Sequence, residues 1–80
     1  MRLPRDWSGN DLAKALGRFG YAITRQKGSH IRLTTPIPSE HHITIPNHNP
    51  LRIGTLKAIL DSVAAHLAVS RDDLLTALLS

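Results

Sequence analysis

A central stretch of alternating apolar and polar residues, with an apolar stripe of helical spacing on each side, most constrains how this chain can fold. Ile31 and Leu33 alternate with polar residues, which is the period of a half-buried strand. The helical stripe before them consists of Leu12, Ala15, Leu16 and Phe19, and the stripe after them of Leu56, Ile59, Leu60, Val63 and Leu67. This pattern predicts helices packed on a sheet.

Local signals divide the chain further. We expect strands at residues 21–26, with Ile23 buried, and at 29–35 and 42–45. The first helix is expected to begin at Ser8, with Asp11 completing a capping box, and to end at Gly20 in a left-handed conformation. Thr55 is expected to cap the second helix. Ser70 is expected to cap the third, with Asp73 as its capping-box partner. Three consecutive short strands favour an antiparallel meander. The predicted fold is therefore α+β, in the order α-β-β-β-α(-α), with helices on one face of a three-stranded sheet and one domain over residues 1–80.

Strand parity predicts which side chains face away from the core. If Ile31 and Leu33 point inward, His30 and Arg32 point together to the opposite face. The same reasoning sends His42 and Thr44 to that face. We expect functional groups there, because the other face is covered by helices.

The charge of the chain is uneven. The formal net charge is +4, and no acidic residue occurs between Asp11 and Glu40. That interval contains Lys14, Arg18, Arg25, Lys27 and Arg32. A basic middle segment suits a polyanion such as RNA, although an ordinary, slightly basic domain would show the same balance.

The sequence has no cysteine, and neither a targeting segment nor a run of about 20 apolar residues is visible. A cytoplasmic location is therefore expected.

The segment from Gln26 to His30 is the most informative. Gly28 permits a tight turn, and a histidine that opens the next strand on its exposed side can exchange protons near neutral pH. RNA cleavage needs a base for the 2′-hydroxyl, and cations such as Arg25, Lys27 and Arg32 to stabilise the crowded phosphate. On the residues alone, a plain turn followed by an exposed histidine is the preferred interpretation.

Two other readings are disfavoured. His41, His42 and His48 suggest a metal site, but they lack cysteine partners and the i, i+4 helical spacing of zincins. We expect no metal and no cofactor. Aromatic residues are few, which argues against a sheet that stacks single-stranded bases.

The order of several segments resembles the HicA-type mRNA interferase toxins. The matching segments are 8–12, 16–21, 25–30, 46–48 and 54–60, and the likeness extends roughly from Trp7 to Leu75. Arg25-Gln26-Lys27-Gly28-Ser29-His30 carries the most characteristic motif. The chain departs from the family at residues 36–41 and at Asn47, where a basic residue is usual.

The resemblance implies a fold like that of double-stranded-RNA-binding domains and a type II toxin that cleaves mRNA without a metal. It places the catalytic histidine at His30 and implies neutralisation by a HicB-type antitoxin that covers this site. Expected RNA-binding residues are Arg25, Lys27, Gly28, Ser29, Arg32 and His48. Alternatives are a non-catalytic RNA-binding module and an antitoxin-binding module with the same fold.

Overall fold

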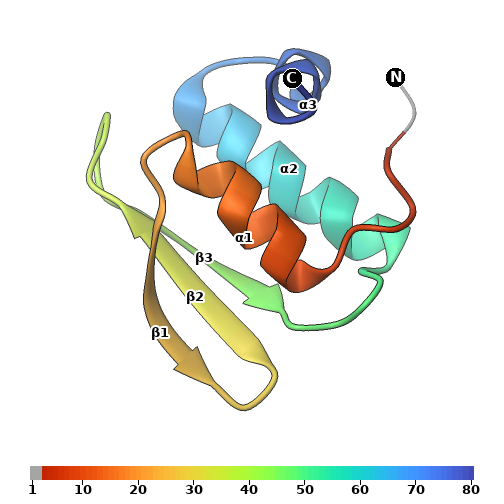
Figure 1. The fold of residues 1–80 in the computed structure, drawn as a ribbon. Helices are drawn as coiled ribbons and strands as arrows, with labels where there is room; N and C mark the ends of the chain where they lie inside the picture. Colours follow the sequence, from red (N-terminus) through yellow and green to blue (C-terminus); the bar gives the residue numbers. More distant parts are fainter. Residues whose placement is uncertain (1–2) are drawn as a thin grey trace.

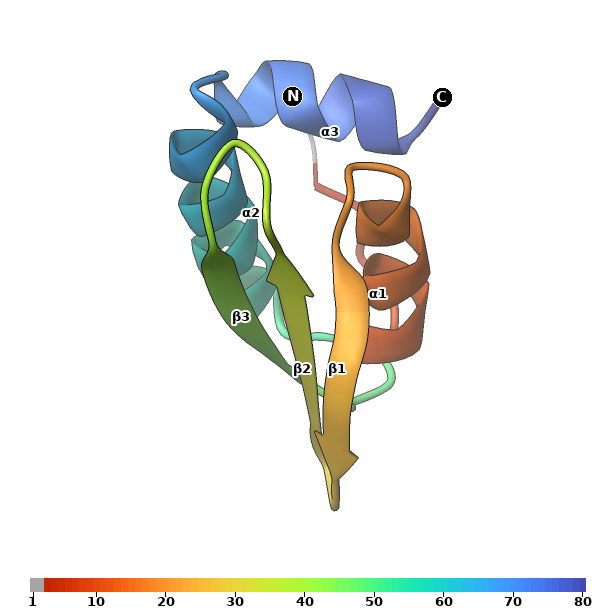
Figure 2. The ribbon, with the colours of Figure 1, turned by 90° about the vertical axis from the view of Figure 1, so that its left-hand side faces the viewer.

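The computed structural model describes residues 3–80 and contains three helices and three strands in these residues. In chain order they are α1 (Gly9–Gly17), β1 (Ala22–Lys27), β2 (His30–Thr35), β3 (His41–Pro46), α2 (Ile53–Leu67) and α3 (Arg71–Leu78). The strands form one antiparallel sheet in the order β1-β2-β3. Helices α1 and α2 cover one face of this sheet, and α3 crosses their ends (Figures 1 and 2). The predicted α+β order is confirmed.

The start of α1 is fixed by its cap. The Ser8 hydroxyl accepts a hydrogen bond from the Asp11 amide at 3.1 Å, and the Asp11 carboxylate accepts one from the Ser8 amide at 3.0 Å. These bonds lower the pKa of Asp11, because they favour the charged carboxylate. The predicted capping box is confirmed. The helix ends at Gly17 with Arg18 as its right-handed cap, so Gly20 (φ +92°) belongs to the turn that follows and is not the helix stop.

The sheet contributes its inner face to one apolar core. Ile31, Leu33 and Ile45 are fully buried, and Ile43 is nearly so. They pack with α1, α2 and α3 through a core completed by Leu12, Leu16, Leu56, Leu60, Val63, Leu74 and Leu75. The inward half of the predicted strand parity is therefore confirmed in β2 and β3.

Strand β1 departs from the prediction. Ile23 was expected to be buried, yet its exposed fraction is 53%. It pairs with buried Leu33, but β1 is an edge strand and every residue in it is exposed. Tyr21, immediately before the strand, is the residue that enters the core, at 3% exposure.

The two later helices begin at different kinds of cap. Helix α2 begins at Ile53 after Arg52, which provides no side-chain cap, so the cap predicted at Thr55 is wrong. Thr55 lies in the first turn instead, because the extended backbone that precedes a helix occurs at Arg52. In α3 the Ser70 hydroxyl accepts a hydrogen bond from the Asp73 amide at 3.0 Å, which confirms the predicted N-cap. This bond is the Ser70 half of the predicted capping box with Asp73. The guanidinium of Arg18 in turn donates to the carbonyls of Ala77, Leu78 and Ser80.

Within residues 3–80 no single helix is long and apolar enough to cross a membrane. Only α2 and α3 taken together pass on length and composition, and they are bent by 102° at their junction.

Candidate nucleic-acid interface

The sheet face opposite the helices carries two adjacent hollows. We define the first hollow by Arg25, Lys27, His30, Arg32 and Thr44. We define the second hollow by Thr24, Arg25, Arg32, Thr34, Glu40 and His42. The predicted exposure of His30, Arg32, His42 and Thr44 on one face is confirmed. Arg25 and Arg32 line both hollows and thus connect them.

A β-bulge brings Arg25 to this face. Ile23 pairs with Leu33, whose side chain points to the helices. If side chains alternated strictly from Ile23, Arg25 would also point to the helices. Instead the register shifts between Ile23 and Arg25, so that Arg25 pairs with Arg32. A bulge sets two residues of one strand opposite one residue of the other, and Thr24 and Arg25 both lie on the outer face. Gln26 then pairs with Ile31 and Lys27 with His30, which places Lys27 outward as well.

The turn between β1 and β2 positions the most basic part of the face. Lys27 and His30 pair directly, so only Gly28 and Ser29 form the loop. Gly28 has φ +57°, a conformation that two-residue hairpin turns require and that glycine adopts without strain. The carbonyl of Ser29 accepts a hydrogen bond from the Asn47 amide at 2.6 Å. The hairpin tip is therefore tied to the chain that leaves β3.

His30 itself is exposed at the start of β2. Within residues 3–80 no carboxylate or hydroxyl is hydrogen-bonded to its ring. Its neighbours in the first hollow are three cationic side chains and the Thr44 hydroxyl. The site thus offers one exposed imidazole beside three positively charged side chains, an arrangement that suits a phosphate group.

His48 does not join the other predicted site residues. Its side chain is exposed and lines neither hollow. Its backbone carbonyl accepts a hydrogen bond from the Gly9 amide at 2.9 Å. A Cβ atom at Gly9 would lie 2.3 Å from the Pro46 carbonyl oxygen. The segment from Pro46 to His48 is therefore packed backbone to backbone against the start of α1.

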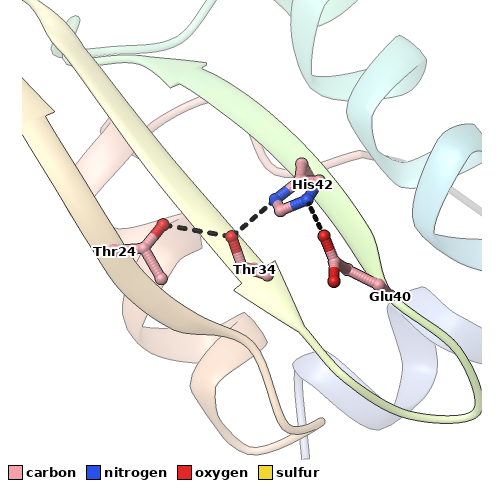
Figure 3. Close-up of polar contacts among 4 residues, drawn as sticks. All are labelled: Thr24, Thr34, Glu40 and His42. Atoms are coloured by element: carbon pink, nitrogen blue, oxygen red, sulfur yellow. Dashed lines mark hydrogen bonds and ion pairs between the residues drawn. The ribbon is translucent and has the colours of Figure 1, made fainter.

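Four side chains on the sheet face form a continuous hydrogen-bonded chain (Figure 3). The Thr24 and Thr34 hydroxyls lie 3.0 Å apart, and Thr34 Oγ1 lies 2.8 Å from His42 Nδ1. His42 Nε2 lies 2.6 Å from Glu40 Oε1. We call these residues the polar chain. Sequence reasoning placed His42 on this face but missed Glu40 and the two threonines as partners, because Glu40 lies outside the alternating pattern.

The neighbouring His41 points to the other side of the sheet. Its Nδ1 lies 2.7 Å from the Tyr21 hydroxyl, and its ring stacks on His66 with centroids 4.3 Å apart. Burial, followed by the proximity of His66 and His42, lowers the pKa of His41. His41, His42 and His48 thus lie in three separate places, and no group of three or more metal-ligating side chains gathers anywhere in residues 3–80.

The fold and the site together define the class of this protein. It is a small α+β protein with a polar, positively charged face on its sheet. A family model described as the HicA toxin of bacterial toxin-antitoxin systems matches residues 9–64. The chain belongs to this family. No curated protein and no solved structure gives a significant match.

Proposed function

We propose that the protein is the toxin of a type II toxin-antitoxin pair and that it cleaves mRNA with His30 as general acid or base. The observation that carries the proposal is the first hollow of a HicA-family chain. There one exposed imidazole is surrounded by Arg25, Lys27 and Arg32.

The chemistry assigned to these residues is phosphodiester cleavage by the neighbouring 2′-hydroxyl. His30 takes the proton of that hydroxyl, the 2′-oxygen bonds to phosphorus, and the bond between phosphorus and the 5′-oxygen breaks. The departing 5′-oxygen takes a proton from solvent water, and the protonated His30 returns its proton to water. Negative charge builds on the phosphate oxygens in the transition state, and nearby cations stabilise it. Lys27 is paired with His30, so its ammonium is the cation assigned to the scissile phosphate. The catalytic groups in this step, His30 and Lys27, belong to the protein, and no cofactor is assigned.

Recognition of RNA is assigned mainly to phosphate contacts. Arg25 and Arg32 line both hollows and can bind successive phosphates. At the hairpin tip, Gly28 allows close approach of the backbone and the exposed Ser29 offers a hydroxyl. His48 is a peripheral RNA contact in this proposal, because it lies outside both hollows.

The partner that neutralises the toxin is proposed to be a HicB-type antitoxin. Membership of a toxin-antitoxin family supports an antitoxin partner. Since His30 and the three cations share one open face, a protein that covers this face would block RNA and the catalytic histidine together.

One observation favours a second candidate, an RNA-binding domain that does not cleave. A general base is usually oriented by a further group, and the His30 ring has no such partner within residues 3–80. In that case the basic face would bind RNA through phosphates, and its affinity would fall steeply with salt.

Cleavage of a long mRNA by the purified protein, with a chelator present, decides between the two candidates. The proposal predicts that the protein cuts the mRNA into fragments and that prior addition of the cognate antitoxin prevents this cleavage. Intact RNA together with salt-dependent binding would establish the second candidate instead.

A further inference from the structure

Glu40 places a negative charge on the face that is proposed to bind phosphate. Among the described residues that line the two hollows it is the one acid, beside Arg25, Lys27 and Arg32. A carboxylate repels a phosphate at close range. It does, however, accept hydrogen bonds from the N–H groups of a nucleobase. Glu40 therefore marks a position where a base, and not the backbone, would face the protein.

The polar chain orients this exposed carboxylate through one of its two oxygens. Thr34 Oγ1 lies 2.8 Å from His42 Nδ1, and His42 Nε2 lies 2.6 Å from Glu40 Oε1, so the imidazole links the hydroxyl to the carboxylate. Thr24, 3.0 Å from the Thr34 hydroxyl, completes the support. These bonds use one lone pair of Oε1 and leave Oε2 free of the chain. Groups positioned in advance lose less conformational entropy when a ligand binds.

We propose that the second hollow is a base-recognition subsite for guanine, in which the Glu40 carboxylate accepts hydrogen bonds from N1–H and N2–H2. The inference rests on the proposed RNA cleavage, because it assigns the substrate preference of that same face. His42 and Thr34 are positioning residues in this assignment.

Guanine is chosen because of its Watson–Crick edge. It has two adjacent N–H donors, which match the two oxygens of a carboxylate. Adenine and cytosine offer one amino group next to an acceptor, and uracil offers one N–H between two carbonyls. Each of these alternatives would set an acceptor against the Glu40 carboxylate. A base in single-stranded RNA exposes this edge to side chains.

The subsite lies at a defined distance from the first hollow. Thr34 is four residues beyond His30 on β2, or roughly 13 Å along a strand. That separation is too large for His42 and His30 to act on one phosphate. Arg25 and Arg32 line both hollows, so they would bind the backbone that connects the base to the cleaved bond. Cleavage is therefore expected at a fixed offset from a guanine.

The test uses short RNAs that are identical except at one position, which holds guanine, inosine or adenine. Inosine lacks only the N2 amino group. The wild-type protein is expected to cut the guanine RNA fastest, ahead of adenine by about tenfold to a hundredfold, with inosine between them. Glu40→Gln should reduce these differences to near unity. Asp61→Asn is the control, because it removes one negative charge from α2, where Asp61 meets Arg71 at 3.3 Å.

The outcomes separate this inference from the proposed function. Equal cleavage of all three RNAs by the wild type, or an unchanged guanine preference in Glu40→Gln, would overturn the subsite and leave the nuclease in place. If the wild type cuts no RNA, the proposed function fails and the subsite fails with it. A loss of preference in Asp61→Asn as large as in Glu40→Gln would also overturn the inference, since net charge alone would then explain it.

Discussion

Lys27 and His30 pair directly across the two-residue turn that joins β1 to β2. Both side chains line the first hollow. The backbone of Gly28, at φ +57°, makes this pairing possible, because a longer loop would separate the two residues. The conformation of one glycine thus sets the two-residue turn that places Lys27 directly opposite the proposed catalytic histidine.

Gly28→Ala is expected to destabilise the protein by about 1–2 kcal/mol, the cost of a left-handed conformation in a residue with a side chain. Space is not the cause, since a Cβ atom at this position meets nothing within 4 Å. Gly54→Ala is the control, because it is equally unhindered but lies in α2. It should leave stability unchanged or raise it by up to about 1 kcal/mol. Urea unfolding measures both variants, and equal stabilities would contradict the role assigned to Gly28.

Lys27→Ala should weaken RNA binding without changing which RNAs are preferred. Each lysine that neutralises one phosphate steepens the fall of log affinity with log salt by about 0.7–0.9. Without Lys27 the slope should therefore become shallower by that amount. Binding is measured on the His30→Ala background so that the RNA stays intact. Lys14→Ala removes the same charge from the exposed side of α1, and its slope should match that of the parent.

Gly9→Ala should destabilise the fold for a steric reason. Its Cβ atom would lie 2.3 Å from the Pro46 carbonyl oxygen and 3.1 Å from Asn47 Cα, both backbone atoms that cannot rotate away. Overpacking of this kind costs typically about 1–3 kcal/mol. A lowered melting temperature by circular dichroism is expected. Gly17→Ala, at the unhindered end of α1, should melt close to the wild type, and a Gly9→Ala variant as stable as the wild type would contradict the close contact.

Stability should also depend on pH through His41. Burial lowers the pKa of His41, and nearby His66 and His42 lower it further. The unfolded chain therefore binds a proton at a higher pH than the folded chain does. The stabilising contribution is complete above about pH 6.5 and is lost as pH falls from there toward the lower folded pKa. Tyr21, Ser62 and His66 also face this ring.

The measurement is urea unfolding of the wild type and His41→Gln between pH 5 and pH 8. The wild type should lose more stability than the variant as the pH is lowered through this window. Parallel losses in the two proteins would show that other groups, such as the exposed histidines, cause the pH dependence.

Sequence reasoning succeeded where side-chain periodicity decides the structure. The alternation of Ile31 and Leu33 with polar residues correctly placed His30 and Arg32 on the outer face. It failed where the backbone leaves the regular pattern. The bulge after Ile23 turns Arg25 outward, and the local sequence does not predict this shift in register. The edge position of β1 likewise exposes Ile23 despite its apolar side chain.

The second hollow shows a different limit. Glu40 precedes β3 and lies outside any period, so only the folded chain shows that it meets His42 at 2.6 Å. Conversely, the motif predicts that His48 acts together with His30, yet His48 lines neither hollow. The motif has a structural explanation here, because the Pro46–His48 segment contacts Gly9 through the backbone.

The most direct test of the central claim compares RNA cleavage by the wild type and by His30→Ala under single-turnover conditions, with a chelator present. Matching circular dichroism spectra and melting temperatures are required, and are expected because His30 is exposed. The account predicts that cleavage falls by about 10²–10⁴-fold, the usual contribution of one general acid or base, while RNA binding is largely retained. Cleavage by His30→Ala at the wild-type rate would contradict it.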